Sequence, residues 1–285
     1  MPDFIKLRDC LDRLAFEYDT GYLDSDPVGI VHEFETREDR EIAGFVVSVL
    51  AYGGATQIRN SARAVLECAG KSPSEFVRSL SPEKALDIFH SFKHRWTGGG
   101  DIAFIFWILG RILDEFGSVG ELVRSLDNPR ETTIEGVMTR FSEWILIRYS
   151  ERFSVGGTPR NISYLIPSPI RGSTCKRLAL YFRWMVRGPD GVDFGLWQFI
   201  SPARLVIPVD RHIARMAGIL RLTSRRSADW KMVLTITENL RYLDPLDPVR
   251  YDFALVRPGI LGKCSGVQKG NCVSCHLRKV CSEAI

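Results

Sequence analysis

Four cysteines near the end of the 285-residue chain have the clearest chemical meaning of any residues in the sequence. The pattern C-x7-C-x2-C-x5-C is formed by Cys264, Cys272, Cys275 and Cys281. Thiolates at such intervals can close around one metal ion or one iron–sulfur cluster, and the neighbouring glycines allow a short loop to fold around a small group. The pattern therefore predicts that these four side chains are metal ligands.

The spacing favours a [4Fe–4S] cluster, with zinc as the alternative. Structural zinc sites commonly use two C-x2-C pairs, or one such pair with two histidines. This chain has a single C-x2-C pair with one lone cysteine on each side. A disulfide framework is not expected, because the total of seven cysteines is odd and the chain is large.

Asp210 is the next residue whose surroundings suggest chemistry. It stands where a helix should begin, because Pro208 lies just before it and apolar residues follow at helical spacing. A carboxylate in this place accepts hydrogen bonds from free backbone N–H groups, which keeps it ionised and fixed in direction. The same pattern occurs in ordinary helix caps, so a catalytic role needs a second signal.

Aromatic and basic side chains alternate in the segment 92–96, Phe-Lys-His-Arg-Trp, just before three glycines. Trp96 in such a segment could stack on nucleic acid bases or wedge between them. The segment could equally be a loop whose rings pack into the core. Tyr52 and Gln57, which follow a predicted helix, are further candidates for a base pocket or wedge.

Helical periodicity runs through most of the chain and predicts an all-α protein. The predicted helices cover residues 41–51, 102–116, 134–149, 173–187, 210–220 and 230–243. Glycine and proline clusters separate them, and alternating strand patterns are scarce. The candidate residues therefore belong to helix ends and to the loops between helices.

Charge is distributed unevenly along the chain. The net charge is +4, but residues 206–285 carry an excess of +6. This excess suits a surface that faces phosphates, although a solvated basic face would look the same. No apolar run approaches the length of a membrane span, and the N-terminus lacks the layout of a signal peptide, so we expect a cytoplasmic protein outside the membrane.

The cysteine spacing and the segment Val-Asp-Arg-His-Ile at 209–213 together resemble the helix-hairpin-helix DNA glycosylase superfamily, in particular endonuclease III and its adenine-glycosylase relatives. Those proteins have a C-terminal [4Fe–4S] loop with the pattern C-x6-C-x2-C-x5-C, one residue shorter in the first gap. They also have a Val-Asp-x-His helix start whose Asp is catalytic, which implies that role for Asp210. The segment 41–66 is similar to the early helix and strand-wedging loop of that family.

A departure from the family concerns the nucleophile. Endonuclease III has a lysine 18 positions before its Asp, where this chain has Val192, and the segment 188–195 is not the standard hairpin that offers backbone N–H groups to a phosphate. An archaeal 8-oxoguanine glycosylase type of the same superfamily places its lysine at the start of the preceding helix. That resemblance points to Lys176, 34 positions before Asp210, while a solvated lysine is the alternative.

Basic side chains around these motifs are expected to contact DNA phosphates. On the predicted helix 173–187, Lys176, Arg183 and Arg187 lie near one line, because 7 and 11 residues make about two and three turns. The full expected set is Arg177, Arg183, Arg187, Arg211, Lys269, Arg278 and Lys279.

These expectations combine into a two-lobe protein with DNA glycosylase-like architecture. Residues 35–205 would form a helical barrel with an enlarged hairpin, and residues 1–34 with 206–285 would form the domain that holds the iron–sulfur cluster. The implied function is base excision by a monomer on DNA with a damaged base, with possible Schiff-base lyase activity. The alternative is a non-catalytic iron–sulfur protein that binds nucleic acid. The whole chain also resembles a bacterial family described only as a domain of unknown function, in stretches such as 183–187 and 247–254.

Overall fold

Helices dominate the architecture. The structure, a computed structural model, describes residues 2–152, 159–266 and 272–283. Within these residues, strand is confined to a short hairpin of β1 (Lys93–His94) and β2 (Thr97–Gly98), in which His94 pairs with Thr97. The predicted all-α class is therefore confirmed, with this hairpin as its exception among the described residues.

The helical elements follow one another with short connections. Those before residue 130 are α1 (Phe4–Glu17), η1 (Thr20–Ser25), α2 (Val28–Val31), α3 (Arg37–Val49), α4 (Ala55–Ala69), α5 (Pro73–Arg78), α6 (Pro82–Phe89), α7 (Gly99–Phe116) and α8 (Val119–Leu126). The later ones are α9 (Glu135–Arg152), α10 (Pro159–Leu165), η2 (Pro169–Arg171), α11 (Lys176–Val186), η3 (Pro202–Arg204), α12 (Arg211–Ile219), α13 (Trp230–Arg241), α14 (Asp252–Ile260) and η5 (Arg278–Val280).

Capping side chains explain where the predicted helices begin. The helix predicted from residue 41 starts at Arg37, because the Thr36 hydroxyl accepts a hydrogen bond from the Asp39 N–H at 3.1 Å. The helix predicted from residue 102 starts at Gly99, because the Asp101 carboxylate accepts from the Gly98 N–H at 2.9 Å. In both helices, polar capping residues place the first turn before the apolar pattern from which the helix was predicted.

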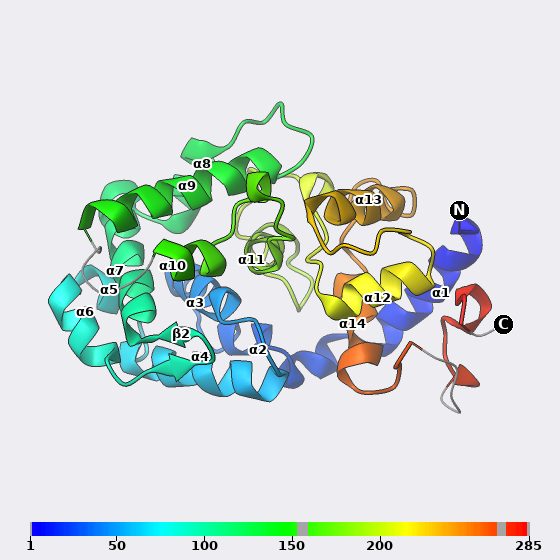
Figure 1. Ribbon diagram of the computed structural model, residues 1–285, viewed down its shortest axis with the longest axis horizontal. Coiled ribbons are helices and arrows are strands. Elements are labelled where there is room, and N and C mark those ends of the chain that lie inside the picture. The colour runs from blue at the N-terminus through cyan, green and yellow to red at the C-terminus, as the bar shows by residue number, and fades with distance from the viewer. Residues whose placement is uncertain (1, 153–158, 267–271, 284–285) are drawn as a thin grey trace.

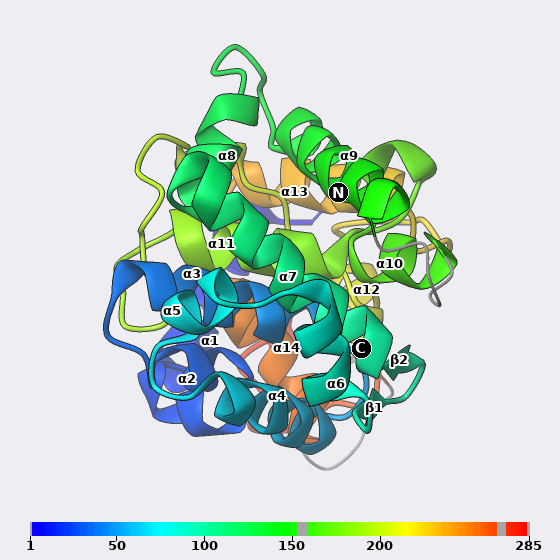
Figure 2. The same ribbon diagram turned by 90° about the vertical axis from the view of Figure 1, so that its left-hand side faces the viewer.

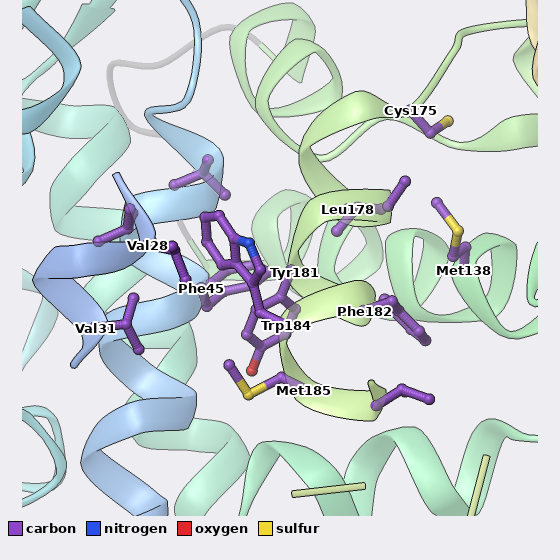
Figure 3. Packing of buried hydrophobic residues seen from close by; sticks show 14 of the residues in the cluster. Val28, Val31, Phe45, Met138, Cys175, Leu178, Tyr181, Phe182, Trp184 and Met185 are labelled. Carbon is purple, nitrogen blue, oxygen red and sulfur yellow. The ribbon is translucent and has the colours of Figure 1, made fainter. Parts of the chain in front are cut away.

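Helix α11 lies at the centre of the molecule and is buried on most of its surface (Figure 1). Figure 3 shows its apolar side chains between α2 and α3 on one side and Met138 of α9 on the other, with Trp184 directed toward Val28. The approach to α3 is close, since a Cβ at Gly44 would lie 2.7 Å from the Met185 Cε. This packing fixes the start of α11, from which Lys176 projects.

The two ends of the chain lie on the same side of the molecule (Figure 1). Helix α1 packs against α14 and the C-terminal η5, and α12 also packs against α14. The proposed division into residues 35–205 and 1–34 with 206–285 stays a prediction. Among the described residues, no helix has the length and apolar character needed to cross a bilayer.

The segment 188–195, which lacks the standard hairpin sequence, is a non-helical loop in the structure. It folds back along the last turns of α11, because the Phe194 N–H donates to the Trp184 carbonyl at 2.8 Å. The Asp190 carboxylate closes the turn by accepting from the Val192 and Asp193 N–H groups at 3.0 and 2.8 Å. These hydrogen bonds hold the loop against the end of α11.

Candidate active-site cavity and cysteine segment

A cavity of about 710 Å³ lies between elements that are far apart in the sequence. Its walls come from the segment before α2, the start of α4, one face of α11, the start of α12 and one face of α14. Its lining residues with ionisable side chains are Asp26, Arg59, Lys176, Arg183, Asp210, Arg211, His212 and Asp252. The cavity is therefore large enough for a small organic group and has acids and bases on its walls.

Lys176 and Asp210 meet on the wall of this cavity. The Lys176 Nζ lies 3.2 Å from the Asp210 Oδ2 and donates to the Ala51 carbonyl at 3.3 Å. The Lys176 side chain keeps 28% of its exposure and that of Asp210 keeps 18%, so both remain accessible. Residues 34 positions apart come into contact because α11 and α12 both begin at this wall.

Asp210 caps α12, as its sequence position predicts. Its Oδ1 accepts hydrogen bonds from the N–H groups of His212 and Ile213 at 2.8 and 2.9 Å, and its Oδ2 faces Lys176. Burial raises the pKa of Asp210, but the Lys176 ammonium and the Ile213 N–H outweigh burial and hold that pKa below its usual range. The carboxylate is therefore ionised near neutral pH and fixed in direction.

Two members of the expected basic stripe are held in ion pairs, Arg183 buried and Arg187 half-buried. Arg183 is 3% exposed and donates to Asp193 at 3.0 Å and to Asp252 at 2.5 Å. Arg187 contacts Asp193 at 3.0 Å and Asp247 at 2.7 Å. Asp193, Asp247 and Asp252 lie outside α11, so the spacing of residues along that helix could not reveal these ion pairs. The expectation that Arg183 and Arg187 contact DNA phosphates is therefore corrected, because both side chains tie α11 to its neighbours.

Arg177 also departs from its expected role. Its side chain is buried, its Nη2 donates to the Tyr164 carbonyl, and its guanidinium lies 4.1 Å from the Tyr164 ring centroid and 5.3 Å from that of Tyr52. The Tyr52 ring in turn stacks with Trp96, whose centroid is 6.1 Å away at an interplanar angle of 11°. Arg177 therefore packs its buried guanidinium against the rings of Tyr164 and Tyr52, where a phosphate cannot contact it.

The wedge candidates lie beside the cavity. Gln57 lines it directly, and Tyr52 stands between Ala51 and Gly53, which also line it. Trp96 is 64% exposed at the turn of the β1–β2 hairpin. The structure thus places all three candidates at or next to the wall that carries Lys176.

The four cysteines lie within electrostatic reach of one another. Burial raises the pKa of Cys275, and the thiols of Cys264, Cys272 and Cys281 raise it further. The Leu277 N–H bonds to the Cys275 sulfur, a contact of the kind that tunes iron–sulfur clusters. The donor set fits four-thiolate ligation, although no group of three or more His, Cys, Asp or Glu within the described ranges is arranged as a formed metal site.

Arg215 ties the cysteine segment to the helix that Asp210 caps. It donates to the Cys264 and Ser265 carbonyls at 2.9 and 3.5 Å, while the Ser282 N–H donates to the Ile219 carbonyl at 3.1 Å. The segment is therefore anchored to the middle of α12 and to its C-terminal end.

The remaining basic candidates differ in position. Arg211 is exposed and lines the cavity, and Arg278 and Lys279 are exposed beside the cysteine segment. Lys269 lies outside the described residues. Three of the expected phosphate contacts are therefore accessible to a ligand.

Sequence reasoning missed three residues of the site. Asp252 begins α14 and is 4% exposed, and burial raises its pKa to about 6 because Arg183 only partly offsets the loss of water. Arg59 lines the cavity, and Tyr164 belongs to the aromatic group. Asp252 falls in the stretch 247–254 that resembles the uncharacterised family, which was the one signal for it. Arg59 and Tyr164 had none, because only the tertiary fold brings them to the site.

Comparison with known proteins gives one match. A family model described as "Protein of unknown function (DUF2400)" matches residues 26–261, which contain nearly all of the cavity lining and end before the first cysteine of the C-terminal segment. No curated protein and no solved structure matches the chain.

Proposed function

Because the chain belongs to the DUF2400 family, whose description assigns no activity, we propose from the site itself that it is a DNA repair glycosylase. The observation that carries the proposal is the contact of the Lys176 Nζ with the Asp210 Oδ2 at 3.2 Å on the wall of a cavity of about 710 Å³. An amine nucleophile beside an ionised carboxylate is a pair suited to breaking an N-glycosidic bond. The proposal also takes up the resemblance of the cysteine segment and Asp210 to helix-hairpin-helix glycosylases.

Asp210 would act first in this reaction. A target nucleotide must leave the base stack to reach the cavity, at a cost of a few kcal/mol. As the bond between C1′ and the base breaks, its electron pair leaves with the base and positive charge grows on the sugar. The Asp210 carboxylate, held by two backbone N–H groups, would stabilise that charge without having to reorient.

Lys176 would then form the new bond. Its ammonium must first lose a proton, and Asp210, whose Oδ2 lies 3.2 Å from the Lys176 Nζ, is placed to accept it. The neutral amine attacks C1′, and opening of the sugar ring leaves a Schiff base between Nζ and C1′. Loss of a proton from C2′ would then expel the 3′ phosphate, and water would release the lysine.

Accessible cations and the cysteine segment would bind the DNA. Arg211 at the cavity and Arg278 and Lys279 beside the cysteines offer positive charge to phosphates. The cysteine side chains Cys264, Cys272, Cys275 and Cys281 would hold a [4Fe–4S] cluster, or zinc as the alternative. When bound, such a group supplies rigidity to the loop that carries these cations.

Borohydride trapping tests the proposal. The purified protein should form a covalent adduct with duplexes that carry an abasic site or a suitable damaged base, because borohydride reduces the Schiff base. Lys176→Ala should abolish the adduct, and Asp210→Asn should slow base release by about a hundredfold or more, as loss of a preorganised electrostatic partner does. Lys231→Ala is the matched control, since Lys231 is an exposed lysine of α13 that does not line the cavity.

The opposite outcome is equally defined. If no duplex in a broad lesion panel gives base release or an adduct, while binding to DNA weakens steeply with salt, the chain is a non-catalytic nucleic acid-binding protein. Trapping that survives Lys176→Ala would reject Lys176 as the nucleophile. Unfolding of Asp210→Asn must also be measured, because Asp210 caps α12, although Asn is an equally good cap.

A further inference from the structure

A group of three aromatic rings stands outside the cavity, on the wall next to Lys176. Tyr52 stacks with Trp96 at 6.1 Å, and the Tyr164 ring meets both edge-on, with centroids 5.6 Å from Tyr52 and 6.2 Å from Trp96. Trp96 is 64% exposed and Tyr164 is 45% exposed. Two adjoining exposed rings backed by a third form an apolar surface of the kind that binds ligands.

Guanidinium groups accompany these rings. Arg95 is exposed and lies over the Trp96 ring, 4.4 Å from its centroid. Arg177 lies below Tyr164 and Tyr52 at 4.1 and 5.3 Å. Flat aromatic and guanidinium surfaces together match the flat, electron-rich face of a nucleobase, and the positive charge matches its phosphate.

The hairpin that carries Trp96 is held firmly. His94 is buried, and its ring bonds to the Ser61 hydroxyl of α4 at 2.8 Å and to the Tyr52 carbonyl at 3.0 Å. The Tyr52 hydroxyl bonds to Thr97 Oγ1 at 2.5 Å and donates to the His94 carbonyl at 2.8 Å. Figure 2 shows β1 and β2 at the edge of the molecule, near α6. Because the hairpin is already fixed, a ligand that binds Trp96 would lose little free energy to ordering of the backbone.

The turn of the hairpin is strained in a way that favours function. Arg95 has a φ of 55°, in the left-handed region that residues with a side chain seldom adopt. Such strain persists where surrounding contacts impose it and gathers at binding sites. Here it places Arg95 over Trp96 and beside Gly53, where an added Cβ would meet the Arg95 Cδ at 3.3 Å.

The rings and the cavity share one wall. Tyr52 lies between Ala51 and Gly53, which line the cavity, and Arg177 directly follows Lys176. A nucleotide that occupies the cavity leaves its former partner base unpaired, and the exposed Trp96 beside Tyr52 is a surface on which such a base can stack.

We propose that Trp96, Tyr52, Tyr164 and Arg95 form a stacking platform for an unpaired nucleobase, a second base site outside the cavity. It deepens the proposed function by naming the preferred substrate as DNA with a base that has lost its partner. The platform rests on that function only for the identity of its ligand, because stacking requires no cleavage.

Binding to DNA without a lesion tests the platform separately from catalysis. The probes are a fully paired duplex and the same duplex with one extra unpaired thymidine, measured by fluorescence anisotropy at one salt concentration. The full-length protein should prefer the unpaired base, and Trp96→Ala should weaken that binding by about tenfold, the size of one lost base–aromatic stack. Trp96→Phe should keep most of the preference.

A matched control and a spectroscopic readout complete the test. Phe16 is 88% exposed on α1, away from the cavity lining, and Phe16→Ala should leave both affinities unchanged. The other five tryptophans are less exposed than Trp96, so the unpaired base should quench tryptophan emission in the native protein but not in Trp96→Phe.

Each result has a definite meaning. Equal loss of both affinities in Trp96→Ala, or no loss at all, would overturn the platform, as would failure of the native protein to bind either duplex. A preference that depends on Trp96 in a protein without trapping or base release would uphold the platform and reject the glycosylase. Covalent trapping by a protein in which Trp96→Ala has no effect on binding would uphold the glycosylase and reject the platform.

Discussion

Asp252 belongs to a partly buried network in which carboxylates outnumber guanidinium groups. The guanidinium groups of Arg183 and Arg187 face four carboxylates, those of Asp190, Asp193, Asp247 and Asp252. Burial raises the pKa of Asp193 and brings that of Asp252 to about 6, and Asp210 adds to the rise at Asp252. A carboxylate that lacks a full counter-charge in a dry site is easier to protonate. The network therefore makes the floor of the cavity sensitive to pH.

We expect native stability to fall between about pH 4 and pH 7 relative to an Asp252→Asn variant. The folded protein binds the Asp252 proton more tightly than the unfolded chain, whose Asp has the ordinary pKa of 3.8. This contribution is fully present below about pH 4 and is lost as the pH rises through about 6, with an upper bound on the order of 3 kcal/mol. Thermal unfolding of both proteins across this range measures it. Parallel curves would show that Asp252 does not titrate there.

At this scale the sequence predicts some residues and not others, for a physical reason. Asp210 is predictable because a proline and an apolar helical pattern define a cap locally. The contact of Lys176 with Asp210 came from a family resemblance. Arg183 and Arg187 were misassigned because spacing shows which residues share a helix face, but not whether acids of other segments cover that face.

Helix α7 shows how closely the elements pack. It approaches α5 at Gly110, where an added Cβ would lie 2.2 Å from the Val77 carbonyl oxygen. Only a residue without a side chain fits there, because a backbone carbonyl cannot move aside as a flexible side chain can. Near the start of the same helix, Gly100 is exposed, and a Cβ there would meet the Leu86 Cδ2 at an ordinary 3.9 Å.

Opposite effects of the same substitution are therefore expected at the two glycines. Gly110→Ala should destabilise the protein by about 1–3 kcal/mol, the usual cost of overpacking. Gly100→Ala should be neutral or stabilise it by up to about 1 kcal/mol, because alanine loses less conformational freedom in a helix. Denaturant unfolding of both variants measures the difference. A Gly110→Ala protein as stable as the native one would show that α5 and α7 are not packed as described.

Six of the α-helices were predictable, because each has an apolar stripe of two turns or more; these are α3, α7, α9, α11, α12 and α13. Shorter helices such as α2 and α5 are too short to show such a stripe. The β1–β2 hairpin was not, because its strands have two residues each and leave no alternating pattern. Tertiary contacts define it, chiefly those of His94 with Ser61 and Tyr52.

Across the whole molecule, the cysteine segment joins the two chain ends to the proposed catalytic helix. Glu17 of α1 forms an ion pair with Lys263 at 3.3 Å, and its Oε2 lies 3.1 Å from the His276 Nε2. Arg215 and Ile219 hold the same segment against α12, whose first turn is capped by Asp210. A group bound by the four thiolates would therefore brace α1 and α12 together. Loss of this group should therefore disturb the position of α12 and, with it, the cavity wall that Asp210 belongs to.

Metal analysis of protein purified without oxygen should find iron and inorganic sulfide in about equal amounts, near four of each per chain, as a [4Fe–4S] cluster requires. Removal of the iron by a chelator should lower the thermal unfolding temperature and weaken DNA binding, because α1 and α12 lose their shared anchor. Cys281→Ser should reproduce both effects. Cys68→Ser should not, since Cys68 is an exposed residue of α4 outside the segment. One zinc ion per chain and no sulfide would show that the four cysteines bind zinc and not a [4Fe–4S] cluster. The cysteine spacing would then no longer support the glycosylase proposal.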